Sequence, residues 1–411
     1  AEDDFHCSEK DDMPHNAVTR RQFLRCASTL AALSACAPFI GRLSNAAWAD
    51  EPKEQESRMI FDEGLNWVTR ASAERLCSRI ARAGFNAFSP CVWHGRGTIW
   101  PSQLAPWDSH NTRAQGFDPL ANLLQTAQQY GIEVHPWFTL SLRQRDFFPE
   151  FYDSTTPAQR FDVHLESFRT FIASLVLEVA ATYPVHGINL DFVSAGGICI
   201  SPHCVEDYRR QTGRNLSLDR QLRHGVPLFD MTELIAWQAA AVTDLVTRIS
   251  MSCRRVKPNI VISLSGDPVH RILKMEGHDS TRWVNEGLID VLYNMHYEPN
   301  PDFDALAAIQ STMKRPAAVV VGIGNYEKAA PKGPVLSREP GKVADLIRAA
   351  RSLQRGNGVA VYLYSMLSDA QIDGLRAGVF AHPAKPSWMR ALTSTSGSDS
   401  PPAAVKGLKV S

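Results

Sequence analysis

Four acidic residues stand where apolar runs of the chain end. Asp191 closes the run in His186–Gly197, HGINLDFVSAGG, and Glu63, Asp267 and Glu298 follow three other runs. Two carboxyl groups can hydrolyse a glycosidic bond, because one donates a proton while the other acts as nucleophile or base. We therefore take Asp191, Glu63 and Asp267 as candidate catalytic residues. An acid at the end of a strand can equally cap a helix or pair with a basic residue.

Aromatic, amide and basic side chains accompany these acids. Sugar rings place C–H groups on aromatic faces, while their hydroxyl groups bond to amides and charged groups. The candidate substrate-binding residues are Trp93, His94, Arg96, His135, Trp137, Tyr293, Asn294, His296, Glu298 and Tyr364. The tryptophans could instead pack beneath long loops, and the histidines could be structural residues held by hydrogen bonds.

The elements that position these residues alternate between short apolar strands and amphipathic helices. The strands are expected at Arg58–Glu63, Phe85–Val92, Ile132–Phe138, Gly187–Phe192, Asn259–Ser265, Leu288–Met295, Ala317–Gly324 and Gly358–Tyr364. A helix pattern follows each strand, which predicts an α/β protein with a (β/α)8 TIM barrel, in a single domain with long βα loops. A doubly wound open sheet is the alternative, but no glycine-rich G-x-G-x-x-G turn follows the first strand.

The barrel prediction converts the candidate residues into a spatial site. In (β/α)8 barrels the active site lies at the carboxyl ends of the strands and is built from the loops that follow them. All of the candidates stand in or just after the predicted strands, so we expect them to gather at one end of the barrel.

Several blocks of the sequence resemble a known family in collinear order over roughly residues 58–380. They are TIWPSQLAPW from Thr98, GFDPL from Gly116, GIEVHPWF from Gly131, HGINLDFV from His186, YRRQTG from Tyr208, VKPNIVISLS from Val256 and GLIDVLYNMHY from Gly287. These blocks are similar to the bacterial glycosyl hydrolase-like 10 domain. The resemblance implies a (β/α)8 barrel and hydrolysis of glycosidic bonds in bacterial cell-wall or extracellular polysaccharides.

The chain departs from this family beside Asp191. The family usually has two adjacent acids where this chain has Asp191-Phe192, so only the first is kept. The strand also resembles that of the family 18 chitinases, whose acid would stand at Val193. If the chain is an enzyme, Asp191 must therefore pair with an acid from another strand, and Glu63 or Asp267 is expected. The alternative is a non-catalytic barrel that binds glycans after losing one catalytic acid.

The amino-terminal segment has the pattern of an export signal. Thr19–Leu24 reads TRRQFL, a short apolar run follows, and Ala47–Ala49 forms a small-x-small cleavage site. Paired arginines before such a run are typical of a twin-arginine signal peptide, which predicts a periplasmic or secreted protein and the twin-arginine export machinery as a partner. The run is too short for a stable membrane span. A lipoprotein-like LSAC sequence offers lipid anchoring at Cys36 as the alternative.

These signals divide the chain into four parts. We predict a signal peptide at 1–49, a linker at 50–57, the glycosyl hydrolase-like barrel at 58–381 and a disordered carboxyl-terminal tail at 382–411.

Composition and cysteine usage narrow the function classes further. The net charge of zero gives no electrostatic footprint for nucleic acid, and no flavin, molybdenum or iron–sulfur signature is present, so no cofactor is expected. Cys199 and Cys204 could close a small disulfide loop. Metal binding by Cys199, His203 and Cys204 is not expected, because no second pair of cysteines accompanies them.

Overall fold

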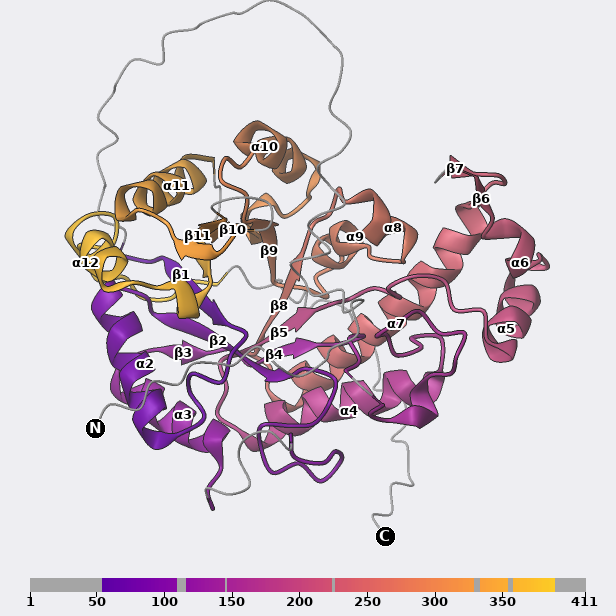
Figure 1. Cartoon of the computed structure of the whole chain (residues 1–411), viewed down its shortest axis with the longest axis horizontal. Coiled ribbons are helices and arrows are strands. Elements are labelled where there is room, and N and C mark those ends of the chain that lie inside the picture. The colour runs from indigo at the N-terminus through magenta and orange to yellow at the C-terminus, as the bar shows by residue number, and fades with distance from the viewer. Residues whose placement is uncertain are drawn as a thin grey trace, which may run out of the picture.

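A closed barrel of parallel strands surrounded by helices forms the body of the molecule (Figure 1). The computed structural model describes residues 54–108, 116–144, 146–223, 226–328, 333–353 and 358–388. The strand order around the barrel is β1-β13-β10-β9-β8-β5-β4-β2, and β1 closes the ring by pairing with β2. The (β/α)8 fold class predicted from the sequence is therefore confirmed. The predicted signal peptide at 1–49 and residues 389–411 of the predicted tail lie outside the described residues.

The barrel strands lie close to their predicted positions. In chain order they are β1 (Ser57–Asp62), β2 (Ala87–Trp93), β3 (Glu133–Val134), β4 (Trp137–Thr139), β5 (Gly187–Asp191), β8 (Val261–Gly266), β9 (Val291–His296), β10 (Val319–Gly324) and β13 (Gly358–Tyr362). Two short hairpins lie outside the barrel, β6 (Leu222–Arg223) with β7 (Val226–Pro227) and β11 (Tyr326–Lys328) with β12 (Val335–Ser337).

The helices cover the outside of the barrel and build its loops. The larger outer helices are α2 (Arg70–Ala83), α3 (Pro119–Gln129), α4 (Glu166–Thr182), α7 (Thr232–Val256), α10 (Phe303–Thr312), α11 (Pro340–Leu353) and α12 (Asp369–Ala377). The loops and insertions carry α5 (Pro202–Thr212), α6 (Leu216–Asp219), α8 (Arg271–Met275), α9 (Ser280–Asn285) and the 3-10 turns η3 (Pro149–Phe151), η4 (Pro316–Ala318) and η5 (Tyr364–Met366). The insertion with α5 and α6 projects to the right in Figure 1. Among the described helices, none combines the length and hydrophobicity needed to cross a bilayer.

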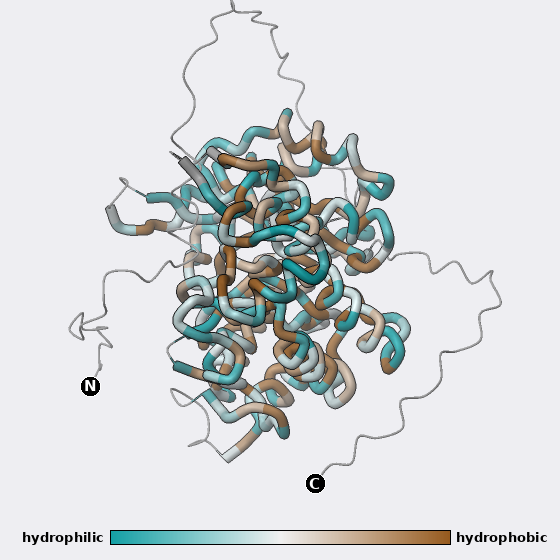
Figure 2. Tube along the Cα trace, turned by 90° about the vertical axis from the view of Figure 1, so that its right-hand side faces the viewer, coloured by the Kyte–Doolittle hydropathy of each residue, from teal (hydrophilic) through white to brown (hydrophobic). Residues whose placement is uncertain are grey.

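Local sequence signals explain where these helices begin. The Asp118 carboxylate accepts a hydrogen bond from the Ala121 N–H at 3.0 Å, and Pro119 occupies the first turn of α3. Such a cap satisfies a backbone N–H that has no partner within the helix. Along the outer segments of Figure 2, hydrophobic and hydrophilic residues alternate, as expected for helices that bury one face.

The third strand position differs from its prediction. The sequence predicts one strand over Ile132–Phe138, whereas the structure has two short strands, β3 and β4, separated by His135 and Pro136. Pro136 has no N–H to donate to a neighbouring strand, so the ladder is interrupted there. The two pieces nevertheless occupy one place in the barrel beside β2.

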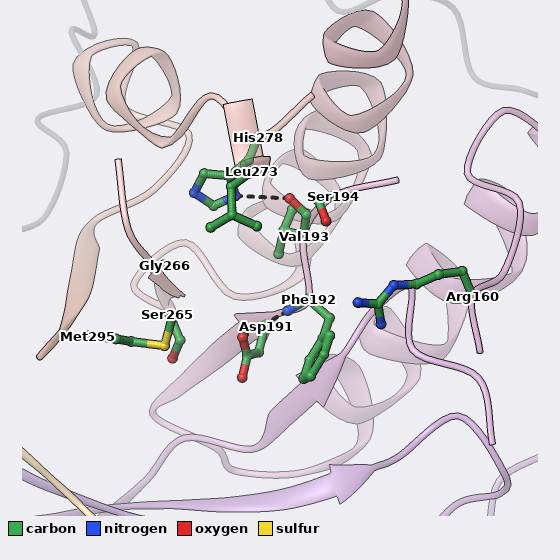
Figure 3. Close-up of a pocket in the computed structure, with 10 residues that line it drawn as sticks. All are labelled: Arg160, Asp191, Phe192, Val193, Ser194, Ser265, Gly266, Leu273, His278 and Met295. Carbon is green, nitrogen blue, oxygen red and sulfur yellow. Dashed lines mark hydrogen bonds between the residues drawn. The ribbon is translucent and has the colours of Figure 1, made fainter. Parts of the chain in front are cut away.

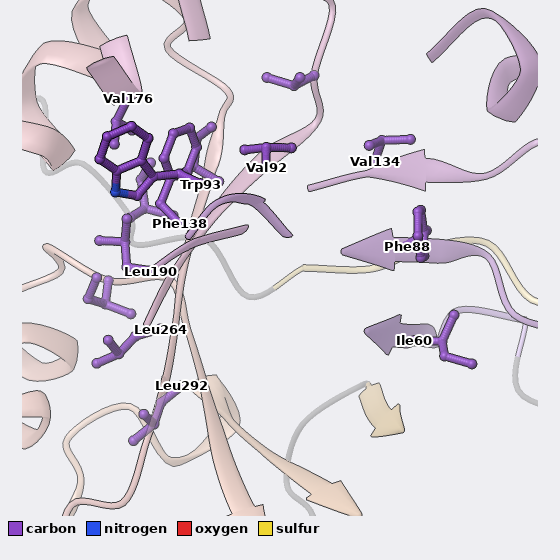
Figure 4. Close-up of a cluster of buried hydrophobic side chains, with 14 of the residues drawn as sticks. Ile60, Phe88, Val92, Trp93, Val134, Phe138, Val176, Leu190, Leu264 and Leu292 are labelled. Atoms are coloured by element: carbon purple, nitrogen blue, oxygen red, sulfur yellow. The ribbon is translucent and has the colours of Figure 1, made fainter. Parts of the chain in front are cut away.

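Side chains alternate between the inside and the outside of the barrel. Met59, Phe61, Cys91 and Tyr293 belong to a cluster inside it, which also contains Trp137. The larger cluster lies between the strands and the outer helices, and Figure 4 shows its members Ile60, Phe88, Val134, Phe138, Leu190, Leu264 and Leu292. This alternation aims every second residue of a strand at the barrel axis and so determines which side chains can line the mouth.

The amino ends of the strands are covered by residues from the predicted tail. Glu56 N–H donates to the Lys385 carbonyl oxygen and Lys385 N–H to that of Glu54, both at 2.9 Å. Trp388 packs against the cluster inside the barrel, and its Nε1 donates to Glu133 at 2.6 Å. The described residues 382–388 therefore differ from the disordered tail expected from residue 382, because they extend the edge of β1 and fill the end of the barrel.

Candidate active site

A pocket opens at the carboxyl ends of β5 and β8 (Figure 3). It is lined by Arg160, Asp191, Phe192, Val193, Ser194, Ser265, Gly266, Leu273, His278 and Met295. Its volume of about 40 Å³ holds a few water molecules rather than a sugar ring. A sugar bound here would therefore lie above the pocket, with one substituent or an attacking water inside it.

Asp191 is the last residue of β5 and is 4% exposed. Its Oδ1 atom accepts a hydrogen bond from the Phe192 N–H at 2.8 Å. The backbone of Phe192 lies in the left-handed region, with φ of 52°, and Ser141 holds this conformation by donating from Oγ to the Phe192 carbonyl oxygen at 2.7 Å. A non-glycine residue in this region costs free energy, and such strain is concentrated at functional sites. The turn ends the strand and leaves the Asp191 carboxylate in the pocket.

Arg160 places a positive charge beside this carboxylate. The guanidinium lies over the Phe192 ring, 5.0 Å from its centroid, and Figure 3 shows it pointing toward the Asp191 side of the pocket. Burial lowers the pKa of Arg160, while the negative charges of Glu276 and Asp191 oppose that change. Arg160 therefore lies between two acids, of which the sequence predicts only Asp191.

Gly196 makes this position of Arg160 possible. A Cβ atom built on Gly196 would lie 1.9 Å from Nε of Arg160, and the glycine has φ of +68°. Any other residue here would collide with the arginine and strain the backbone. Gly196, the first glycine after Asp191 in HGINLDFVSAGG, thus leaves room for the arginine beside the acid.

Glu276, at the end of α8, is the acid that sequence reasoning missed. Its Oε2 atom accepts a hydrogen bond from Ser194 Oγ at 3.0 Å, and its carbonyl oxygen accepts one from the Ala195 N–H at 2.9 Å. Burial raises the pKa of Glu276, while the Arg160 charge and the Ser194 hydrogen bond act in the opposite direction. A buried carboxyl that retains its proton can serve as a general acid. Glu276 does not end a strand, so the strand-end rule could not identify it. The one weak signal in the sequence is the glycine that follows it, which marks the end of a short helix.

His278 lines the opposite wall of the pocket. Its Nδ1 atom lies 3.0 Å from the Val193 carbonyl oxygen, so the neutral ring donates from this nitrogen. Burial lowers the pKa of His278, although the Val193 hydrogen bond and the Asp267 charge favour the proton. The ring thus fixes the loop after Asp191, and it too lies outside the predicted strand ends.

The predicted acids Glu63 and Asp267 also lie around the mouth. Glu63 accepts a hydrogen bond from the hydroxyl of Tyr362, whose ring stacks on Tyr297 with centroids 4.7 Å apart. Burial raises the pKa of the Cys91 thiol inside the barrel, and the charges of Asp191 and Glu63 raise it further. Asp267 stands after β8, where Oδ1 accepts from the Val269 N–H at 3.1 Å. Asp191 and Glu63 therefore both lie near Cys91, and Asp267 lies near His278.

Four predicted substrate-binding residues lie at or just after strand ends at the mouth. Arg96 donates to Asp108 at 2.7 Å and to Gln144 at 3.0 Å, which joins two long loops. Burial lowers the pKa of His94, beside Arg96, to about 4. His296, the last residue of β9, and Glu298, two residues further on, contact each other at 3.0 Å.

Six predicted substrate-binding residues lie elsewhere. Trp93 points outward and contacts Phe148 and Phe171, with ring centroids 5.6 and 6.1 Å apart (Figure 4). A register shift between Cys91 and Trp93 turns the tryptophan away from the barrel axis, which the alternation of the sequence cannot reveal. Asn294 is fully buried between inward-facing neighbours on β9, so its side chain faces outward.

The other four are part of the barrel packing or lie beside an outer helix. Tyr293 lies inside the barrel with its ring 5.2 Å from that of Phe61, and Trp137 belongs to the same cluster. His135 contacts Trp388 at the opposite end, where Gly187 leaves room for its ring. Tyr364 packs on the outer cluster. The contacts described for Trp93, Asn294, Tyr293, Trp137, His135 and Tyr364 are packing contacts or buried positions, and their contact with a substrate stays a prediction.

The sequence matches a family model over most of the barrel. The model of the family described as Glycosyl hydrolase-like 10 matches residues 61–155 and 154–338. Glycosyl hydrolase DigH of Escherichia coli (strain K12) is 23% identical over 302 residues, an alignment that covers 61% of this chain and 65% of DigH. The chain thus spans just under two thirds of the length of that relative.

Solved structures of glycosidases share the fold. The PgaB (BpsB) glycoside hydrolase domain from Bordetella bronchiseptica matches with a TM-score of 0.55 and 10% identity, covering 80% of this chain and 97% of that domain. The β-galactosidase from Bacillus circulans sp. alkalophilus matches with a TM-score of 0.60 and 10% identity, covering 80% of this chain and 56% of that protein. At such identities the likeness shows the fold alone.

Proposed function

This chain belongs to the glycosyl hydrolase-like 10 family, and on that premise we propose that it is an exported glycoside hydrolase. Its substrate in this proposal is a bacterial cell-wall or extracellular polysaccharide. The observation that carries the proposal is the position of Asp191 at the end of β5, in a pocket that it shares with Arg160. The family assignment and the glycosidase fold support the reaction class.

Two carboxyl groups perform the proposed reaction. Asp191 attacks the anomeric carbon or activates a water, and the Phe192 N–H together with the Arg160 charge stabilises its ionised form. A second carboxyl group donates a proton to the glycosidic oxygen as the bond breaks. The Arg160 charge also acts on Glu276, the buried acid that accepts a hydrogen bond from Ser194.

The geometry favours Glu276 as the second acid. Burial raises the pKa of Glu276, so this carboxyl keeps a proton to a higher pH than an exposed glutamate does. Glu63 is the alternative expected from the sequence, because it shares Cys91 as a neighbour with Asp191. Asp267 is the other acid expected from the sequence; it stands after β8, and its Oδ1 accepts a hydrogen bond from the Val269 N–H.

A screen of glycan fragments tests the proposed activity. The purified protein is incubated with peptidoglycan and exopolysaccharide fragments, and products are identified by mass spectrometry. We expect shortened fragments from the wild type and none from Asp191→Asn. Asp304→Asn, which changes an exposed acid on α10, is the matched control and should cleave normally. Undiminished cleavage by Asp191→Asn would remove Asp191 from the mechanism.

Export through the twin-arginine route is part of the proposal and rests on the sequence of residues 1–49. Replacing Arg20 and Arg21 by lysine in the full chain should retain the protein in the cytoplasm of a bacterial host. Cys36→Ser tests the lipid-anchored alternative, because it should release the protein from membranes only if Cys36 carries a lipid. Normal export of the double lysine variant would exclude the twin-arginine route.

Glycan binding without catalysis is the second candidate function. The observation that favours it is that Phe192 and Val193, where the two resemblances drawn from the sequence lead us to expect acids, both line the pocket with apolar side chains. Titration calorimetry with the same fragments separates the two functions. Binding without the release of reducing ends over several days would favour the binding protein.

A further inference from the structure

Three potential metal ligands converge beside the mouth, outside the pocket described above. One ligand atom from each of Asp162, Cys199 and Cys204 lies within 4.8 Å of the other two, and all three residues are buried. The Cys199 and Cys204 sulfur atoms lie 3.3 and 3.2 Å from Oδ2 of Asp162. Asp162 precedes α4, whereas the cysteines lie in and after the loop that follows β5.

Local hydrogen bonds fix the positions of Asp162 and Cys204. The Asp162 N–H donates to the Phe151 carbonyl oxygen at 2.9 Å, and its Oδ1 accepts from the His164 N–H at 2.9 Å. Cys204 stands in the first turn of α5, where its N–H donates to Ser201 Oγ at 3.1 Å. The cluster therefore joins the first turn of α5 to the hydrogen-bonded loop that precedes α4.

We propose that Asp162, Cys199 and Cys204 bind one zinc ion. Two thiolates and a carboxylate suit Zn²⁺, which accepts sulfur, nitrogen and oxygen ligands. Ligands about 2.0–2.3 Å from a tetrahedral zinc lie roughly 3.3–3.8 Å apart, close to the sulfur–oxygen distances found here. Binding releases the two thiol protons to solvent, and a water completes the tetrahedron.

The buried carboxylate argues against a disulfide at this place. Forming one would oxidise both thiols and remove the S–H groups that lie against Asp162. The carboxylate would then keep the His164 N–H but face an apolar disulfide in the interior, which is costly for a charged group. A divalent cation instead compensates its charge.

The zinc site would have a structural role near the chemistry. Asp162 is two residues after Arg160, and Cys199 is two residues after Gly197 of the HGINLDFVSAGG segment. An ion bound here joins the loop that carries Arg160 to the loop that follows Asp191. The proposal does not depend on the reaction that the mouth performs.

Metal analysis of the purified full chain tests the proposal. We expect about one zinc per chain, and less than about 0.1 per chain in Cys199→Ser, Cys204→Ser and Asp162→Asn. Cys77→Ser changes another buried cysteine, on α2, and should keep its zinc. Cobalt reconstitution should give a thiolate-to-metal charge-transfer band that the two cysteine variants lack.

Thermal unfolding of the wild type keeps the test decisive if a variant fails to fold. A chelator should lower Tm by roughly 5–10 °C, and added zinc should restore it. Alkylation of the denatured, unreduced protein should label both Cys199 and Cys204. The proposal is overturned if the wild type binds no zinc on reconstitution, or if the two cysteines resist alkylation because they are linked as a disulfide.

Discussion

At the amino ends of the barrel strands Glu56 accepts hydrogen bonds from Arg58 and from Arg351, whereas at the carboxyl ends Arg160 lies among acids that line or adjoin a pocket. The Glu56 contacts measure 2.7 Å to Arg58 and 2.6 and 2.8 Å to Arg351. Burial raises the pKa of Glu56, but the two arginines outweigh it and hold that pKa below its ordinary value.

The two ends also differ in backbone and covering. The amino end is covered by Trp388, which donates to Glu133 and packs against the interior. The carboxyl end has Phe192 in a left-handed conformation beside a pocket. Paired charges and a covering side chain stabilise a fold, while strain and a charge cluster at a pocket prepare it for chemistry. We therefore expect substitutions at the two ends to separate stability from activity.

The largest effect is expected from Asp191→Asn at the carboxyl end. Losing the proposed nucleophile or base should lower kcat by roughly 10³-fold or more, about 4 kcal/mol of transition-state stabilisation. The free energy of unfolding should stay the same or rise, because removing a buried charge relieves a cost of folding. Steady-state kinetics and urea unfolding on one preparation measure both. A marked loss of stability in this variant would place Asp191 among the structural residues.

Glu276→Gln should lower kcat by roughly 10²-fold if Glu276 is the proton donor. Because the raised pKa of Glu276 keeps the acid protonated to higher pH, the wild-type rate should fall on the alkaline side as this group ionises. The glutamine variant should lose that alkaline limb. Glu63→Gln is the matched substitution, and a lost limb in that variant alone would assign the proton donor to Glu63.

Trp388→Ala should destabilise the fold by about 3 kcal/mol and leave kcat nearly unchanged. The substitution uncovers the cluster inside the barrel and removes the hydrogen bond to Glu133. Chemical unfolding gives the free energy, and kinetics on the folded protein give kcat. A large fall in kcat with unchanged stability would contradict the division between the two ends.

The sequence predicted the architecture of the barrel but only part of its mouth. Alternating apolar runs and helix signals placed the strands, and the strand-end rule placed Asp191, because both depend on neighbouring residues in the chain. Arg160, Glu276 and His278 come from loops and a short helix, where no periodicity indicates which residues will meet. The bulge at Trp93 likewise reverses a side chain without a local signal.

The proposed zinc site also depends on residues that are distant from each other in the sequence. The spacing of Cys199 and Cys204 alone did not favour a metal, since their third partner, Asp162, is 37 residues away from Cys199 in the chain. The Trp388 contact with His135 is another long-range pairing, and it moved His135 from the expected mouth to the opposite end. Sequence periodicity describes elements, whereas these contacts depend on how loops from different elements pack together.

The smallest expected effect is a difference between the two ends in how the stability of the fold depends on pH. Burial lowers the pKa of His94, at the mouth, from 6.5 to about 4. The unfolded chain therefore takes up a proton below pH 6.5 that the folded protein refuses, so stability is full above that pH and is lost as the pH falls toward 4. Glu56, at the amino end, has a lowered pKa and an ordinary value of 4.5, so its contribution is lost only at lower pH.

His94→Gln should therefore reduce the loss in the free energy of unfolding between pH 7 and pH 5 by about 1–2 kcal/mol. This range allows for partial exposure of the ring. Asp62 acts with the opposite sign, because burial raises its pKa to about 6 and favours the folded state as the pH falls. The Asp62 contribution is the same in the wild type and the variant, so it cancels when their free energies of unfolding in urea are subtracted. Equal slopes for the two proteins over this range would show that His94 does not stay neutral in the fold, and the pH separation between the two ends would then fail.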